Sequence, residues 1–155
     1  MQTLKRTLSA IIALVLCAFA ITPASAVESD CVENVCRNVA ELKDTVWKLV
    51  ELDGTEIIQA AQQRRETRIT LTGEGARLSA FGGCNQLSGG YVQEGNALRF
   101  TPMASTKMAC EPPFMELEDR FLKMLGATTG FRIEGQQLIL LGGDQQLARF
   151  EALYE

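Results

Sequence analysis

Two cysteines, Cys84 and Cys110, constrain the fold of this chain more than any other feature of its sequence. Cys84 lies in a Gly-Gly-Cys-Asn run (residues 82–85), and Cys110 ends a Thr-Lys-Met-Ala-Cys run (residues 106–110). Glycines permit a tight backbone beside the first cysteine, and prolines follow the second. A disulfide between them would tie the end of a glycine-rich strand to the loop before a helix. This feature specifies a framework and leaves the activity open.

The N-terminus has the three zones of an export signal. Lys5 and Arg6 give a short positive region, residues 8–21 are almost wholly apolar, and Ala24-Ser25-Ala26 is a small-residue cleavage site. We therefore expect residues 1–26 to be a signal peptide that is removed after Ala26. The mature chain is expected in the bacterial periplasm.

A lipid-anchored form is the alternative to simple secretion, because Cys17 follows a Leu-Val-Leu run that partly matches a lipidation box. That box requires a small residue before the cysteine, and Leu16 is large. The apolar run is also too short to span a bilayer core of about 30 Å, and no second run follows. We expect no integral membrane span after cleavage of the signal.

The mature chain is acidic. Removing residues 1–26 takes away two of the 15 basic residues and none of the 19 acidic ones, so the formal net charge moves from −4 to −6. An acidic surface repels phosphate backbones, which argues against nucleic acid as a partner. The remaining length suits one domain with its own core.

Four cysteines remain after cleavage: Cys31, Cys36, Cys84 and Cys110. An even number in an exported chain indicates disulfides, and three pairings are possible. We expect Cys31–Cys36 and Cys84–Cys110, because the first pair is local and the second lies in the two motif loops. A redox couple or a metal site are the alternatives, although the spacing matches no familiar redox or zinc motif.

The chain has no histidine, which removes the commonest general base and the usual nucleophile arrangements. The acidic residues at positions 111, 116, 118 and 119 are clustered. Glu116 with Arg120, and Asp119 with Lys123, have the i,i+4 spacing of a solvated, ion-paired helix face. We therefore expect no catalytic residues, no metal and no cofactor.

Alternating apolar residues and glycine-containing turns predict a β-rich domain. The expected strands are residues 46–52, 67–72, 76–81, a strand beginning at 89, and strands at 97–101, 131–134, 137–141 and 147–153. We infer an α+β fold: a curved, mostly antiparallel β-sheet or partly open barrel with one packed α-helix.

The helix is expected to begin at the prolines of positions 112–113 and to end at Gly126 or Gly130. Its apolar stripe consists of Phe114, Leu117, Phe121 and Leu125, at spacings of three and four residues. Such a stripe favours packing on the sheet. Residues 27–44 are polar and are assigned to an N-terminal extension with a small cysteine loop, and residues 45–155 to the domain.

Several short motifs occur in a fixed order along the chain. They are Trp47-Lys48-Leu49, Gly83-Cys84-Asn85, Gly89-Gly90-Tyr91, Thr106-Lys107-Met108-Ala109-Cys110, the 114–125 helix with Glu116 and Glu118, and Leu138-Ile139-Leu140. Each motif alone has little specificity. Together, over about residues 44–155, they resemble the META domain family, that of the bacterial heat-shock protein HslJ.

This resemblance implies an envelope protein or lipoprotein. Members are associated with stress and antibiotic tolerance in bacteria, and with secretion or virulence in some parasites. Their fold is similar to that of small β-rich pilot proteins that chaperone secretin components. The family supplies no catalytic residues that can be carried over to this chain.

We therefore expect a monomeric, non-enzymatic protein that supports envelope integrity or stress tolerance by binding an envelope protein. The candidate partner-binding residues lie in the loops around the expected bridge: Asn85, Tyr91, Thr106, Lys107 and Met108. The alternative is a binding module for a lipid or other small apolar ligand held between sheet and helix.

Overall fold

The computed structural model of the chain describes residues 31–32, 35–36, 39–59, 63 and 65–154. The expected signal peptide, with Cys17, lies outside these residues, so cleavage and lipidation stay predictions. No helix in the described part of the chain is long and apolar enough to cross a membrane.

Two short strands precede the domain. β1 (Cys31–Val32) and β2 (Val35–Cys36) pair antiparallel, with Cys31 opposite Cys36. The side chains of these strands lie outside the described residues. The Cys31–Cys36 disulfide therefore stays a prediction.

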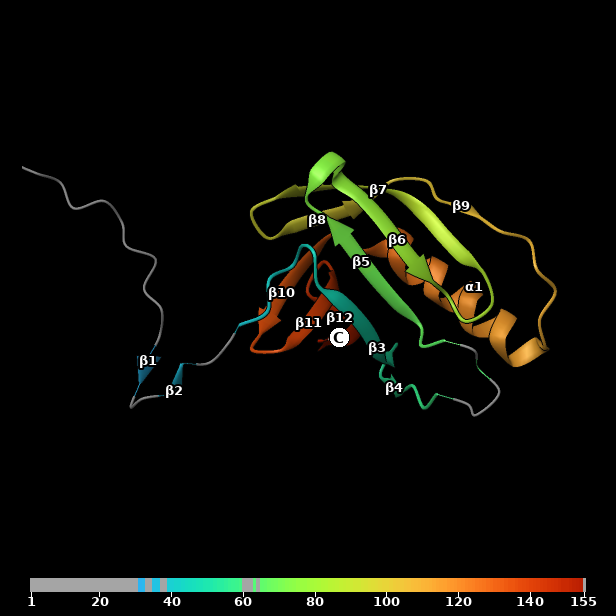
Figure 1. Ribbon diagram of the computed structural model, residues 1–155, viewed down its shortest axis with the longest axis horizontal. Coiled ribbons are helices and arrows are strands. Elements are labelled where there is room, and N and C mark those ends of the chain that lie inside the picture. The colour runs from blue at the N-terminus through green and yellow to red at the C-terminus, as the bar shows by residue number, and fades with distance from the viewer. Residues whose placement is uncertain (1–30, 33–34, 37–38, 60–62, 64, 155) are drawn as a thin grey trace, which may run out of the picture.

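The main sheet has ten strands that curve into a ring (Figure 1). They are β3 (Val46–Leu52), β4 (Thr55–Glu56), β5 (Arg68–Thr72), β6 (Arg77–Phe81), β7 (Gln86–Glu94), β8 (Ala97–Phe100), β9 (Ala104–Ser105), β10 (Gly130–Glu134), β11 (Gln137–Gly142) and β12 (Gln145–Leu153). Neighbours pair antiparallel in the order β12-β11-β10-β8-β7-β6-β5-β3-β4, with β9 beside β7.

The ring closes because β12 also pairs with β3. Its seam lies between β8 and β10, which pair through Ala97 and Gly130 alone. The sheet is therefore a closed ring without the even hydrogen bonding of a true barrel. The expected α+β fold, with a curved antiparallel sheet and one helix, is confirmed.

The helix α1 (Pro112–Ala127) packs against the ring, on the far side of β5 and β6 in Figure 1. Prolines fill its first positions, where a missing amide donor costs nothing. Phe121, Met124 and Leu125 are buried on its inner face. Phe114 and Leu117, expected in the same stripe, are only partly buried.

The core is filled by the inward-facing residues of the ring and by the helix. Successive residues of a strand point to opposite faces of the sheet, so every second residue enters the core. In β5, Ile69 and Leu71 are fully buried while their neighbours are half-buried. Trp47 is 0% exposed, and its indole N–H donates to the carbonyl of Leu42 at 3.0 Å. Residues 40–44 thus join the domain, where Lys43 also bridges to Leu71.

Candidate functional site

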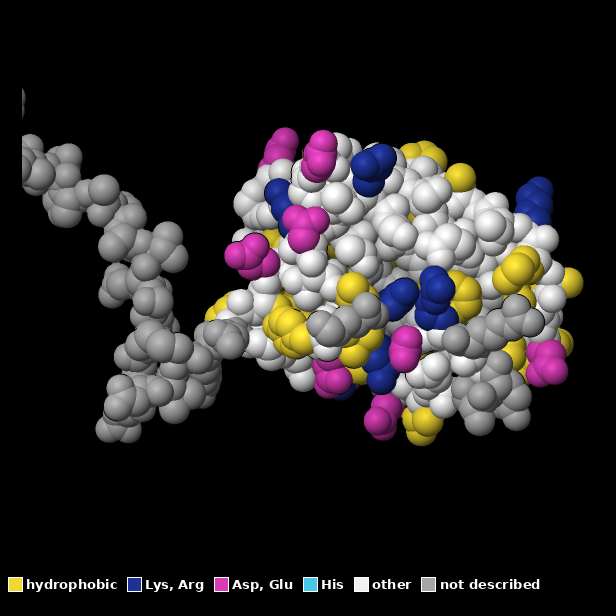
Figure 2. All heavy atoms as spheres, in the orientation of Figure 1, with side chains coloured by type: hydrophobic (Ala, Val, Ile, Leu, Met, Phe, Trp, Pro, Cys, Tyr) yellow, Lys and Arg dark blue, Asp and Glu magenta, His cyan; other side chains and the backbone are white. Residues whose placement is uncertain are grey.

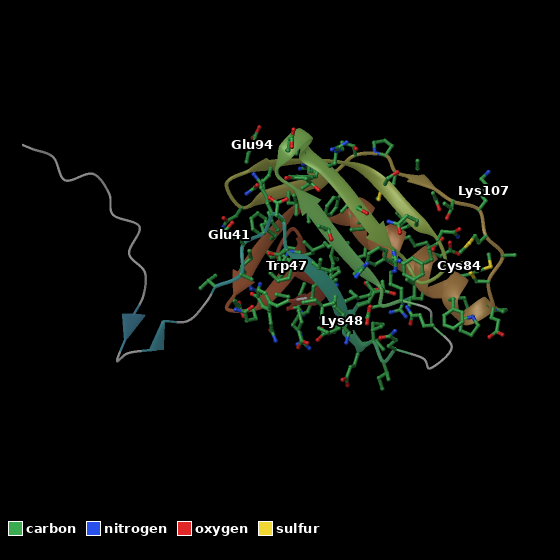
Figure 3. The ribbon with its side chains drawn as sticks, viewed as in Figure 1. Glu41, Trp47, Lys48, Cys84, Glu94 and Lys107 are labelled. Carbon is green, nitrogen blue, oxygen red and sulfur yellow. A yellow bond between two sulfur atoms is a disulfide. The ribbon has the colours of Figure 1, made fainter. Side chains whose placement is uncertain are left out.

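Three segments that are distant in the sequence meet at a disulfide between Cys84 and Cys110 (Figure 3). They are the loop 82–85 between β6 and β7, the loop 101–111 before the helix, and α1 itself through Glu118. The expected pairing of the two cysteines is present, with their Cα atoms 5.9 Å apart. We call residues 82–85, 106–110 and Glu118 the junction.

The two glycines of the junction allow the helix to approach the loop. A Cβ on Gly82 would lie 2.7 Å from Cγ of Glu118, closer than real Cβ atoms come to other atoms. Gly83 has a φ of +123°, which disfavours any residue with a side chain, and a Cβ there would lie 3.2 Å from the carbonyl oxygen of Phe114. The Gly-Gly pair is therefore required by the packing of α1 on this loop.

Glu118 reaches from α1 into the loop and accepts three hydrogen bonds. Its Oε2 accepts from the backbone N–H of Asn85 at 2.5 Å and of Cys84 at 3.3 Å. Its Oε1 accepts from the side-chain amide Nδ2 of Asn85 at 2.8 Å. Successive N–H groups in a turn form an anion-binding concavity, and here the anion is a carboxylate of the same chain.

Asn85 passes this restraint on to the second loop. Its Oδ1 accepts hydrogen bonds from the hydroxyl of Thr106 at 2.9 Å and from the backbone N–H of Met108 at 2.8 Å. The Thr106 hydroxyl oxygen in turn accepts from the backbone N–H of Gln86 at 3.1 Å. A chain of hydrogen bonds thus runs from the helix through loop 82–85 to loop 101–111.

The prediction that the carboxylates of residues 111–119 all lie on a solvated face is wrong for Glu118. Its side chain is buried, with 7% exposure, whereas Glu116 and Asp119 are exposed. A buried carboxylate costs several kcal/mol of desolvation unless it is fully hydrogen-bonded, and the loop supplies those bonds.

The expected i,i+4 ion pairs on this helix are also wrong for Arg120. Its guanidinium lies 3.6 Å from a carboxylate oxygen of Asp53, in the turn after β3, and donates to the carbonyl of Leu52 at 3.1 Å. Arg120 therefore ties α1 to the ring rather than pairing along the helix.

The residues predicted for partner binding have two different environments. Asn85 and Tyr91 are buried, with 7% and 5% exposure, while Thr106, Lys107 and Met108 are exposed. Lys107 points away from the body of the domain (Figure 3). The surface of this site is therefore loop 101–111, and Asn85 supports it from below.

Tyr91 lies in the β7 strand that follows the junction loop. Its hydroxyl donates to the carbonyl of Thr72 at 3.1 Å. Burial raises the pKa of Tyr91 above its ordinary value, and the negative charge of Asp44 adds to this rise. Tyr91 therefore stays neutral and anchors β7 to β5.

The chemistry of the junction is that of positioning. Both oxygens of Glu118 are occupied by hydrogen bonds from the loop, and both cysteines are joined. Among the described residues, no three His, Cys, Asp or Glu side chains are grouped to hold a metal ion.

The described part of the surface includes two hollows. One of about 480 Å³ is lined by residues 39–41 and 43–45 together with Gln136 and Tyr154. The other, of about 160 Å³, lies on the outer face of β5 and β6 and includes Arg65 and Arg68. Neither is lined by the large residues of the core.

Comparison with known proteins identifies the family. The model of the META domain family matches residues 40–154, which is most of the chain. The chain belongs to the META domain family. The junction described above is built from three of the motifs on which the resemblance rested, and the expectation from the sequence is confirmed.

Solved structures agree with this assignment. An NMR structure of a protein from Burkholderia xenovorans is 28% identical, with a TM-score of 0.59, over 74% of this chain and 85% of that one. A second NMR structure, at 22% identity, has a TM-score of 0.56 over 71% of this chain and 91% of that one, which shows the fold alone. No curated protein matches the chain.

The sequence did contain a signal for the role of Glu118. Positions 118, 121 and 125 are spaced by three and four residues, so Glu118 continues the stripe of Phe121 and Leu125. A charged residue inside an apolar stripe indicates a buried partner. That partner was identifiable only once the helix and the Gly-Gly loop were seen together.

Proposed function

We propose that this META domain protein is a non-enzymatic component of the bacterial envelope that binds a protein partner through loop 101–111. The observation that carries the proposal is the restraint of this loop. The loop is exposed and largely irregular, yet it is fixed by the Cys84–Cys110 disulfide, by the pairing of β9 with β7, and by the side chain of Asn85.

Restraint of an exposed loop favours recognition because a preorganised loop loses less entropy on binding. Exposed connecting segments on a rigid scaffold are also where binding residues concentrate. A loop that only joined β8 to α1 would need no such set of bonds. The restraint therefore supports a binding role over a simple connection.

The exposed side chains of this region suit a protein surface. Met108 is 50% exposed, with the exposed Lys107 next to it in the sequence, and Met115, in the first turn of α1, is 46% exposed. Flexible, polarizable methionines adapt to apolar partners. Glu111 and Glu116 are also exposed here, so we infer a contact of mixed apolar and charged character, with Lys107 as its basic group.

Lipid binding between sheet and helix is the less supported function. Trp47, Phe121 and Phe150, which line that space, are fully buried, and the two phenylalanine rings pack edge to face with centroids 6.4 Å apart. An acyl chain would have to displace these side chains. A lipid found on the purified protein by native mass spectrometry would favour this alternative.

The proposed location is the periplasm, after cleavage of the signal at Ala26. A disulfide at the centre of the site supports an oxidising compartment. The intact mass of the exported protein tests this directly: a chain that starts at Val27 supports it, and a diacylglycerol on Cys17 places the protein on a membrane instead.

Photo-crosslinking in living cells tests the partner surface. A crosslinking amino acid replaces Met108 in one variant and Val92 in a control, since Val92 is similarly exposed, at 55%. Gln86 begins β7 beside this loop, where its backbone N–H donates to Thr106, and Val92 lies six residues further along the strand, roughly 20 Å from Gln86. We expect one protein to be captured at position 108 and not at 92, and Lys107→Glu to reduce the capture. Equal capture at both positions contradicts the proposal.

A further inference from the structure

The outer face of β5 and β6 carries a basic hollow that the proposed function does not use. Its volume is about 160 Å³, and its polar and charged lining residues are Arg65, Arg68, Thr70, Ser79 and Gln86. None of its lining residues is acidic, although the whole chain has a net charge of −4. Figure 2 shows dark blue side chains gathered over the region of β3 and β5.

The pairing of the strands places a third cation beside this hollow. Lys48 of β3 is directly opposite Arg68 of β5, and Arg68 is opposite Phe81 of β6. Like charges directly opposite each other on one sheet face are destabilising. Glu151 of β12 is opposite Lys48 on its other side, so it lies next to Lys48 and one strand further from Arg68.

Arg65 lines the hollow beside the aromatic ring of Phe81. Its guanidinium carbon lies 6.0 Å from the centroid of Phe81, within the range of a cation–π contact. A guanidinium near an aromatic face keeps its N–H donors available for other acceptors. The planar donor fork of arginine suits an oxyanion.

Hydroxyl and amide groups complete the lining. Thr70 and Ser79 are opposite each other in the β5–β6 pair, and Ser79 accepts a hydrogen bond from Nε2 of Gln86 at 3.0 Å. The Ser79 hydroxyl hydrogen thus remains to be donated. Arg68 also has an interaction within the chain, but a guanidinium has five N–H donors and can serve two acceptors.

We propose that this hollow binds a phosphoryl group. Two guanidinium groups, a nearby ammonium and hydroxyl donors on two strands can surround the oxygens of a tetrahedral phosphoryl group, which a planar carboxylate fills less well. The volume equals that of about five water molecules, enough for one phosphoryl group with part of its hydration. The source of the group is a free phosphate or the headgroup of a phospholipid.

Titration of the purified protein with inorganic phosphate tests the site, with sodium chloride at matched ionic strength as the reference. We expect saturable NMR shifts at the backbone amides of Thr70, Ser79 and Gln86. Arg65→Gln should weaken binding at least about tenfold, since one charge-assisted contact is worth that much. Arg99→Gln is the matched control, because Arg99 is exposed on β8 and the charge change is the same.

Vesicles distinguish the two sources. Sedimentation with vesicles of phosphatidylcholine plus phosphatidylglycerol, lost in Arg65→Gln but not in Arg99→Gln, assigns the site to a lipid headgroup. Saturable phosphate shifts without vesicle binding assign it to a soluble phosphate. Ser79→Ala, which changes no charge, should weaken whichever binding is found. The proposal is overturned if neither probe binds, if chloride gives the same shifts, or if Arg65→Gln and Arg99→Gln behave alike.

Discussion

Replacing Glu118 by glutamine should destabilise this domain strongly, although the two side chains have nearly the same size and shape. Both carboxylate oxygens accept from donors: the backbone N–H groups of Cys84 and Asn85 on one side and Nδ2 of Asn85 on the other. Glutamine offers one oxygen and one NH2 group. In either orientation of the amide, the NH2 group faces a buried donor.

Asn85 cannot relieve this conflict by rotating its own amide. Its Oδ1 accepts from the backbone N–H of Met108, and that donor is fixed. A rotated Asn85 would place its NH2 group against Met108 instead. The donor–donor clash is therefore moved and not removed.

The magnitude follows from the bonds lost. A buried donor left without an acceptor costs about 1–3 kcal/mol, and the bonds that survive change from charge-assisted to neutral, at roughly 1 kcal/mol each. We expect Glu118→Gln to lower the free energy of unfolding by about 2–4 kcal/mol. Glu116→Gln is the matched control, since Glu116 is exposed on the same helix, and should change it by less than about 0.5 kcal/mol.

Urea unfolding followed by fluorescence measures this difference. Trp47 is the single tryptophan and is fully buried, so its emission reports the folded core directly. A loss below 1 kcal/mol for Glu118→Gln, or equal losses for the two variants, would refute the reasoning about the junction.

Three further predictions concern single residues. Gly82→Ala should cost about 1–3 kcal/mol, because its Cβ would lie 2.7 Å from Glu118, whereas Gly126→Ala in open space at the helix end should be neutral or stabilising. Cys84→Ser should lower the free energy of unfolding by about 2–4 kcal/mol. The double variant Cys84→Ala, Cys110→Ala should cost no more, because the same bond is lost. A Cys84 peptide linked to Cys31 or Cys36 in a non-reducing digest would contradict the proposed disulfide pairing. The pKa of Tyr91 is raised, so its contribution to stability is fully present below about pH 10 and is lost as the pH rises through the folded-state pKa. Urea unfolding at a series of alkaline pH values should therefore show a smaller fall in the free energy of unfolding with pH for Tyr91→Phe than for the native protein.

Much of the fold was predictable from local patterns. The strands from Val46 to Leu52 and from Gln137 to Gly142 follow runs of apolar residues bounded by glycine turns. The two-residue strands β4 and β9 were missed, because they form by pairing with β3 and β7 and have no periodicity of their own.

The junction was predictable only in part. The two cysteine motifs indicated the disulfide, since both cysteines lie in an exported chain. The role of Glu118 depends on the close approach of α1 to Gly82 and Gly83, a tertiary contact between segments more than 30 residues apart. Spacing along one helix identifies which residues share a face but not what that face meets.

Hydrogen exchange at the amide of Met108 tests the central claim, which is that a buried carboxylate holds the exposed loop through Asn85. Met108 lies outside any helix or strand, and its backbone N–H donates to Oδ1 of Asn85 at 2.8 Å, so protection of this amide reports that bond. We expect this amide to be protected in the native protein and in the Glu116→Gln control, and to exchange at least about tenfold faster in Glu118→Gln. An unprotected Met108 amide in the native protein, or the same exchange rate of this amide in the native protein and in Glu118→Gln, would contradict the account.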